Sequence, residues 1–127
     1  MGRRGYVMTR PAEHGSCVTA WAQGSFYHFL TAKAGLEVST DNDFAPENAN
    51  KWEIEIPQKP VGRGKERKFV SDYEAILKIA KRLRTHPDLI KDDDGESGFG
   101  DSCAQLLEEG VQTAKDYEMT AITIDWW

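Results

Sequence analysis

The fold is decided by residues 51–84, which read KWEIEIPQKPVGRGKERKFVSDYEAILKIAKRLR. Over residues 51–56, charged and apolar side chains alternate strictly. Successive side chains of a strand point to opposite faces, so this period predicts a strand with one face in the core and one in water. Pro57 and Pro60 are expected to end the strand, because proline cannot donate to a sheet.

A helix is predicted after the basic loop that follows this strand. Ser71 and Glu74 have the spacing of a capping box, and Pro87 disfavours the α conformation in the residue before it. Apolar side chains recur every three or four residues and share one arc of the helix. They are Tyr73, Ile76, Leu77, Ile79, Ala80 and Leu83.

The segment that precedes residue 41 admits two interpretations. Its aromatic and β-branched content favours two strands, over 18–23 and 26–31, and a hairpin that returns through 36–40. The alternative is a helix capped by Ser25 and ended by Gly35.

A second amphipathic helix is predicted to begin at Asp101 or Ser102. Gly110 lies inside it and lowers its stability by about 1 kcal/mol relative to alanine. Alternation over 119–127 then predicts a closing strand.

These elements, in the order β-β-β-β-α-α-β, predict an α+β fold. A single domain over 17–127 is expected, in which an antiparallel sheet of four to five strands packs against two helices. Residues 1–16 are expected to form an irregular N-terminal arm, because proline and glycine discourage regular structure there.

The composition is that of one folded domain. The chain has 127 residues, of which 39% are hydrophobic, enough for a core without metal or disulfide. No apolar run approaches the roughly 20 residues that span a bilayer, and no apolar segment follows the first arginines as in a signal peptide. We therefore expect a cytoplasmic protein without membrane association, in which Cys17 and Cys103 are buried or idle thiols, with a disulfide between them as the alternative.

The net charge of −5 conceals a division along the chain. Residues 59–84 carry nine basic and three acidic side chains, whereas 85–127 carry two basic and eleven acidic ones. The basic segment contains Gly62-Arg63-Gly64-Lys65, in which glycines allow an anion to approach the backbone, although the spacing of a Walker A loop is absent. A solvated tip is the commoner role of such a loop, and phosphate or nucleic-acid binding is the alternative. The residues that would carry such binding are Arg63, Lys65, Arg67, Lys68, Lys78, Lys81 and Arg82.

Two further groups of residues give only weak signals, one for a metal site and one for an active site. The acidic run 92–96 begins like a calcium loop, but Ser97 and Cys103 stand where glycine and glutamate are required, so no metal site and no cofactor is predicted. Cys17 and His28 are a conceivable nucleophile and base, but their proximity in sequence does not establish that geometry. No catalytic residue is predicted.

The remaining signal is a surplus of aromatic residues, which are favoured at protein interfaces. Two interpretations are open for Tyr27, Phe29 and Trp127: an exposed contact patch, or packing in the core or at its rim. The sequence therefore favours a small protein-binding regulator or inhibitor, of an immunity or phage-encoded kind, rather than an enzyme. Nucleic-acid binding through 59–68 and the helix after it is the main alternative, an enzyme that uses Cys17 and His28 is a weaker one, and a homodimer is left open.

Overall fold

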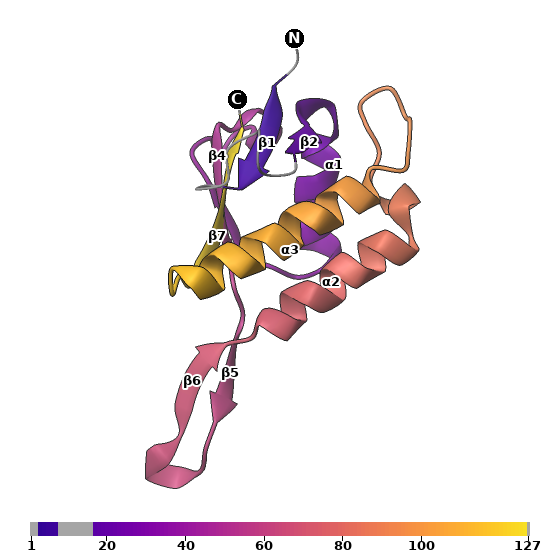
Figure 1. Cartoon of the computed structure of the whole chain (residues 1–127). Helices are drawn as coiled ribbons and strands as arrows, with labels where there is room; N and C mark the ends of the chain where they lie inside the picture. The colour runs from indigo at the N-terminus through magenta and orange to yellow at the C-terminus, as the bar shows by residue number, and fades with distance from the viewer. Residues whose placement is uncertain (1–2, 8–16, 127) are drawn as a thin grey trace.

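The structure is a computed structural model that describes residues 3–7 and 17–126. It is an α+β domain built on a five-stranded antiparallel sheet in the order β2-β1-β7-β4-β3 (Figure 1). The strands are β1 (Arg4–Val7), β2 (Cys17–Thr19), β3 (Val38–Thr40), β4 (Lys51–Glu55) and β7 (Ala121–Trp126). The helices are α1 (Gln23–His28), α2 (Tyr73–Thr85) and α3 (Gly100–Asp116).

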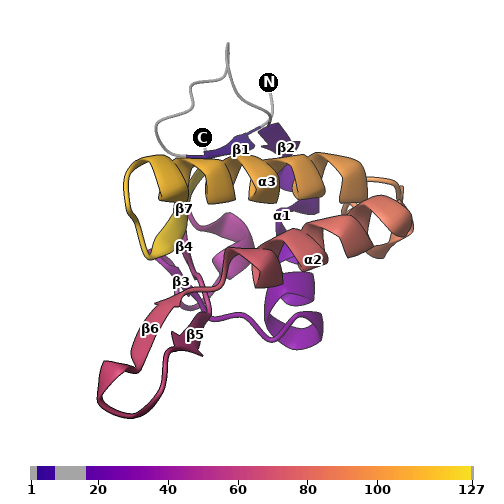
Figure 2. The same cartoon turned by 60° about the horizontal axis from the view of Figure 1, so that its bottom comes forward.

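The sheet buries one face against the helices, as the alternation in β4 predicted. Trp52 and Ile54 of β4 pair with Ile124 and Ile122 of β7, and all four side chains are buried. Glu53, on the other face of β4, is exposed. In both views the helices lie on the same side of the sheet (Figures 1 and 2). The α+β class and the antiparallel sheet are therefore confirmed, with three helices in place of the two that were predicted.

The prediction of strands over 18–23 and 26–31 is wrong beyond the short strand β2. The chain is helical from residue 20 to residue 33, through a 3-10 turn, α1 and a π-helical turn. The buried residues explain why, because they recur at the spacing of a helix and form one apolar stripe. They are Ala22, Phe26, Phe29 and Leu30.

The ends of this helical segment differ in part from the alternative that the sequence offered. Gly35 ends it as expected, with a φ of +70° that favours glycine, and the Leu36 N–H donates to the Leu30 carbonyl at 2.9 Å. Ser25 does not cap it. The Thr19 hydroxyl accepts from the Trp21 N–H instead, and the Ser25 hydroxyl accepts from the Lys91 N–H at 3.1 Å.

Strand β1 was also missed, because residues 1–16 were expected to be irregular. Arg4–Val7 lies between β2 and β7, and Gly5 is opposite Trp126. A Cβ at Gly5 would lie 2.7 Å from the Trp126 ring, so the glycine makes room for the indole. The rest of the predicted arm, residues 1–2 and 8–16, lies outside the described residues.

Both long helices occur where the sequence placed them, but their N-termini differ. The Asp72 carboxylate, and not Ser71, caps α2 by accepting from the Ala75 N–H at 3.2 Å. Helix α3 begins at Gly100, with no side-chain cap from Asp101 or Ser102. A Cβ at Gly100 would lie 2.5 Å from the Leu83 carbonyl oxygen, so the glycine permits the close crossing of α2 and α3.

Gly110 lets α3 approach the sheet. A Cβ at this position would lie 2.5 Å from Cγ2 of Ile122 on β7. We expect Gly110→Ala to lower the free energy of unfolding by about 1–2 kcal/mol, because overpacking outweighs the gain of about 1 kcal/mol in helix propensity. Urea denaturation measures the change. The control is Gln105→Ala on the exposed side of α3, where a shift beyond about 0.5 kcal/mol is not expected; a stabilised Gly110→Ala protein would contradict the account.

Candidate functional site

The basic segment forms a separate two-stranded ribbon that projects from the domain (Figure 1). We call residues 58–71 the basic ribbon. Its strands are β5 (Gln58–Val61) and β6 (Lys68–Ser71). Pro60 was expected to end a strand but lies within β5, opposite Phe69. An isolated ribbon tolerates proline because both of its strands are edges.

The glycines of the ribbon shape its tip. Gly62 and Gly64 have φ values of +91° and +59°, and a Cβ at Gly62 would lie 2.7 Å from the Glu66 carbonyl oxygen. A 3-10 turn over Gly64–Glu66 completes the reversal. The glycines are thus required by the turn itself, whether or not an anion binds beside them.

The ribbon is exposed along its whole length. Every residue from 58 to 70 is exposed, and 62% of the Phe69 side-chain surface is accessible. The pairing places Lys59, Val61, Lys68 and Val70 on one face, and Pro60 and Phe69 on the other. The Arg67 guanidinium lies 5.5 Å from the centre of the Phe69 ring. The ribbon therefore presents apolar groups interspersed with cations.

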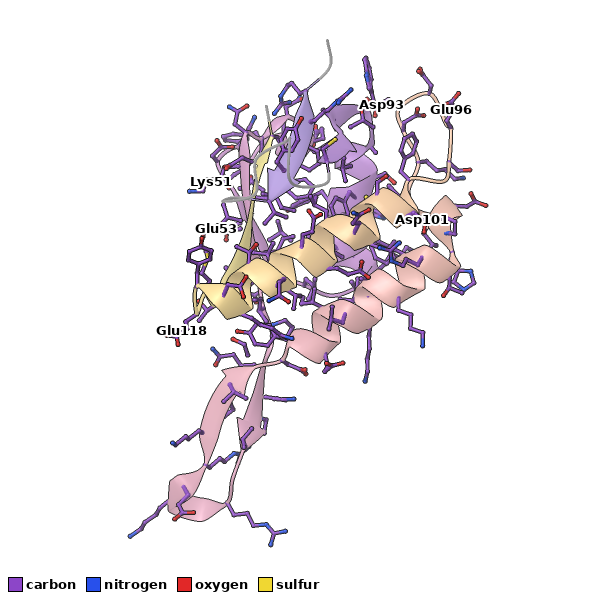
Figure 3. The ribbon with its side chains drawn as sticks, in the orientation of Figure 1. Lys51, Glu53, Asp93, Glu96, Asp101 and Glu118 are labelled. Atoms are coloured by element: carbon purple, nitrogen blue, oxygen red, sulfur yellow. The ribbon has the colours of Figure 1, made fainter. Side chains whose placement is uncertain are left out.

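The basic tip and the acidic loop are far apart in the fold. Figure 3 places Asp93 and Glu96 at the end of the molecule opposite the ribbon. Within the described part of the chain, the ribbon forms one ion pair, Lys59 to Asp72 at 3.9 Å. Arg63, Lys65, Arg67 and Lys68 of the predicted binding set are exposed and have no carboxylate partner there.

The other predicted binding residues lie on α2, which continues from the root of the ribbon (Figure 2). Lys78, Lys81 and Arg82 are exposed, and the Arg82 guanidinium lies 5.5 Å from the centre of the Phe29 ring. Arg84 has a structural role. Its guanidinium donates a hydrogen bond to the Glu108 carboxylate of α3 and thereby lowers the pKa of that carboxyl.

The predicted aromatic patch is wrong for Phe29, which is buried in the core. Tyr27 is half-buried, with its ring 5.7 Å from that of Trp52, and Trp127 lies outside the described residues. The exposed aromatic side chains are others: Trp21, Phe44, Phe69 and Tyr117. A helical period over 20–33 would have revealed Trp21, because this residue falls off the apolar stripe of Ala22 and Phe26.

Cys17 and Cys103 are both free thiols. Burial raises the pKa of the Cys103 thiol far above its ordinary value, which suppresses the thiolate. Cys17 is half-buried on β2 and His28 is exposed on α1. Cavities of about 280, 250 and 190 Å³ lie among the described residues, and none of these is lined by Cys17 or His28.

The acidic loop is a compact turn closed by one of its own carboxylates. Asp92 accepts from the Asp94 and Glu96 N–H groups at 3.0 and 2.8 Å, so this side chain serves the backbone. Among the described residues no group of three or more acidic, histidine or cysteine side chains is placed to hold a metal ion.

Comparisons with known proteins do not assign the chain to a family. No protein-family model, no curated protein and no solved structure matches the chain. Within 3–7 and 17–126, no helix is both long and apolar enough to cross a membrane. The class that the fold defines is a single α+β domain with a projecting basic ribbon.

The first prediction for this site concerns the independence of the ribbon from the core. Replacing residues 59–70 by Asn-Gly leaves Gln58 and Ser71 joined by a two-residue hairpin turn. Because the removed side chains are exposed, we expect the melting temperature to stay within about 4 °C of wild type, the shift that ~1 kcal/mol produces in such a domain. Circular dichroism measures it. Ile54→Ala, which opens the buried face of β4, is the destabilised reference, and a ribbon deletion that melts as early as this variant would refute the expectation.

The second prediction concerns the carboxyl groups of Glu37 and Glu55, near the root of the ribbon. The pKa of Glu55 is raised above its ordinary value of 4.5, first because protonated Glu55 can donate a hydrogen bond to the Glu37 carboxylate, and second because the two carboxylates repel each other. A raised carboxyl pKa contributes stability below the unfolded pKa, and this contribution is lost as pH rises through the folded pKa. Glu37→Gln should therefore raise the melting temperature at pH 7, and the gain should vanish below about pH 4. Glu53→Gln on the same strand serves as the control, and an equal gain at both pH values would exclude a charge effect.

Proposed function

We propose that this protein binds nucleic acid through the basic ribbon, assisted by the cations of α2. The observation that carries the proposal is the projection of a basic ribbon whose tip cations have no carboxylate partner among the described residues. The major groove of DNA admits a two-stranded ribbon of this kind. Phosphates would meet the cations of the tip, which need no internal bond to be broken first.

The acidic body does not oppose this function, because the ribbon holds its tip away from it. The ribbon carries five basic and one acidic side chain, so the rest of the chain is strongly negative. The four residues of strand β5, between root and tip, span roughly 13 Å. The Debye length at physiological salt is about 8 Å, so salt screens the tip from most of the body's negative field.

The apolar groups of the ribbon also suit a nucleic acid. Phe69 offers a ring on which a base can stack, and the neighbouring Arg67 adds a cation to the same face. Val61 and Val70 alternate with Lys59 and Lys68 on the other face. This combination of charge and apolar surface is typical of sequence-tolerant binding.

The second candidate is a regulator that binds an acidic protein surface by the same ribbon. Exposed aromatic and arginine side chains are the residues that most often dominate protein interfaces, and Phe69 and Arg67 lie together here. The two candidates differ in which groups should dominate. A protein interface depends most on Phe69, whereas nucleic-acid binding depends most on the number of cations.

The experiment measures fluorescence anisotropy of a labelled 20-base-pair DNA and of a single strand against salt concentration. For wild type, affinity should fall steeply with salt; for R63A/K65A/R67A, affinity at low salt should be at least tenfold weaker and the logarithmic salt slope smaller by about 2–3. K33A/K51A/K91A removes the same charge from exposed lysines elsewhere and should bind almost as wild type.

Two results from the triple variants would reject the nucleic-acid proposal. One is wild-type affinity in the ribbon variant, and the other is an equal loss in both triple variants. A third measurement separates the candidates: F69A should weaken DNA binding through the lost stacking, while the logarithmic salt slope stays unchanged because no cation is removed. If wild type binds neither nucleic acid at low salt, the acidic-protein candidate replaces the first.

A further inference from the structure

The end of the molecule opposite the ribbon holds a cavity that the proposed function does not use. The cavity has a volume of about 280 Å³ and lies beside Trp21, which is 58% exposed. We call it the Trp21 cavity. Four segments far apart in sequence line it: Arg3, the start of the helical segment 20–33 with Ala20, Trp21 and Gly24, the loop residues Glu47 and Asn48, and Asp93 of the acidic loop.

Short contacts fix these segments relative to one another. The Asp93 N–H donates to the Trp21 carbonyl at 3.1 Å, which ties the acidic loop to the cavity. A Cβ at Gly24 would lie 3.2 Å from Cβ of Glu47, so the loop 41–48 packs closely on α1. The Gln23 amide supports the same loop by donating to the Ala49 carbonyl at 2.9 Å. These contacts therefore hold the walls of the cavity to the folded core.

The cavity is prepared for a cation. Glu47 and Asp93 are exposed, and neither has a cationic partner among the described residues. Arg3 does not supply one, because its guanidinium donates to the Ala49 carbonyl at 2.6 Å and to the Asn50 side chain at 3.1 Å. The exposed Trp21 indole adds a surface that attracts guanidinium and ammonium groups.

The loops around the cavity carry a net negative charge, as the cavity's own carboxylates do. The two loops that reach it, 41–48 and 88–96, carry eight acidic side chains and one basic side chain. The ribbon carries five basic and one acidic. The two regions are complementary, yet they lie at opposite ends of one molecule, so the ribbon cannot reach its own cavity (Figures 1 and 3).

We propose that the Trp21 cavity binds the cationic tip of the basic ribbon of a second copy, through Arg63 or Lys65. Each contact joins two different surfaces, so it leaves one free ribbon and one free cavity at the ends of the pair. Further copies add head to tail, and an open chain forms unless the rotation closes a ring. The contact is between exposed charges and weakens with added salt. This inference does not rest on nucleic-acid binding.

The test is sedimentation equilibrium of nuclease-treated protein. At low salt the mean mass of wild type should rise with concentration above the monomer mass of 14.3 kDa, and it should return to the monomer mass in about 1 M salt, where screening is nearly complete. R63Q/K65Q removes the two cations of the tip, and W21A/E47Q/D93N removes the indole and the two carboxylates of the cavity. All five side chains are exposed, so neither variant should unfold. Each variant alone should remain a monomer.

Mixing the two variants provides the decisive result. The tip variant keeps its cavity and the cavity variant keeps its tip, so the mixture should form a one-to-one dimer and nothing larger. E53Q/E118Q removes two acidic charges from places away from the cavity (Figure 3) and should associate as wild type does.

The proposal is overturned if wild type stays monomeric up to about 1 mM at low salt. It is also overturned if the cavity variant associates like wild type, or if the mixture stays monomeric. The cavity variant should retain wild-type affinity for DNA, since its ribbon is intact. Failure of self-association and failure of nucleic-acid binding are therefore distinguishable.

Discussion

The packing of Trp52 is the contact on which the rest of the fold depends. Its ring lies 4.7 Å from that of Trp126 and 5.6 Å from that of Phe26, so it joins the two central strands to α1. Its indole N–H donates to the Pro46 carbonyl at 3.3 Å. One side chain thus links the sheet, a helix and the loop that forms a wall of the Trp21 cavity. Large aromatic side chains can do this because they bury much apolar surface and keep a polar group at one edge.

The parts of the fold that sequence patterns predicted are those with a long and clean period. Strand β4, helices α2 and α3, and strand β7 each show one. Strand β1 has four residues and an arginine-glycine start, so no pattern marks it. Helix α1 was misread because its aromatic residues have high β propensity, whereas their spacing is helical and burial followed the spacing.

The candidate sites were predictable to different degrees. The cations of the basic ribbon are contiguous in sequence, so their residues were identified, but composition alone did not reveal that the segment leaves the body as paired strands. The segment leaves the body because it has no periodic row of apolar side chains that the core would bury. The Trp21 cavity was not predictable, because Trp21, Glu47 and Asp93 come from segments that no local pattern connects.

The isolation of the basic ribbon has a consequence for how this protein can evolve. No side chain of 58–70 is buried, so selection for folding stability places little restriction on most of these positions. Gly62 and Gly64 are the exceptions, because the turn requires their positive φ. Substitutions between the root and the tip can therefore alter binding specificity while the body remains unchanged. In such a molecule, recognition can diverge quickly among descendants that keep the same scaffold.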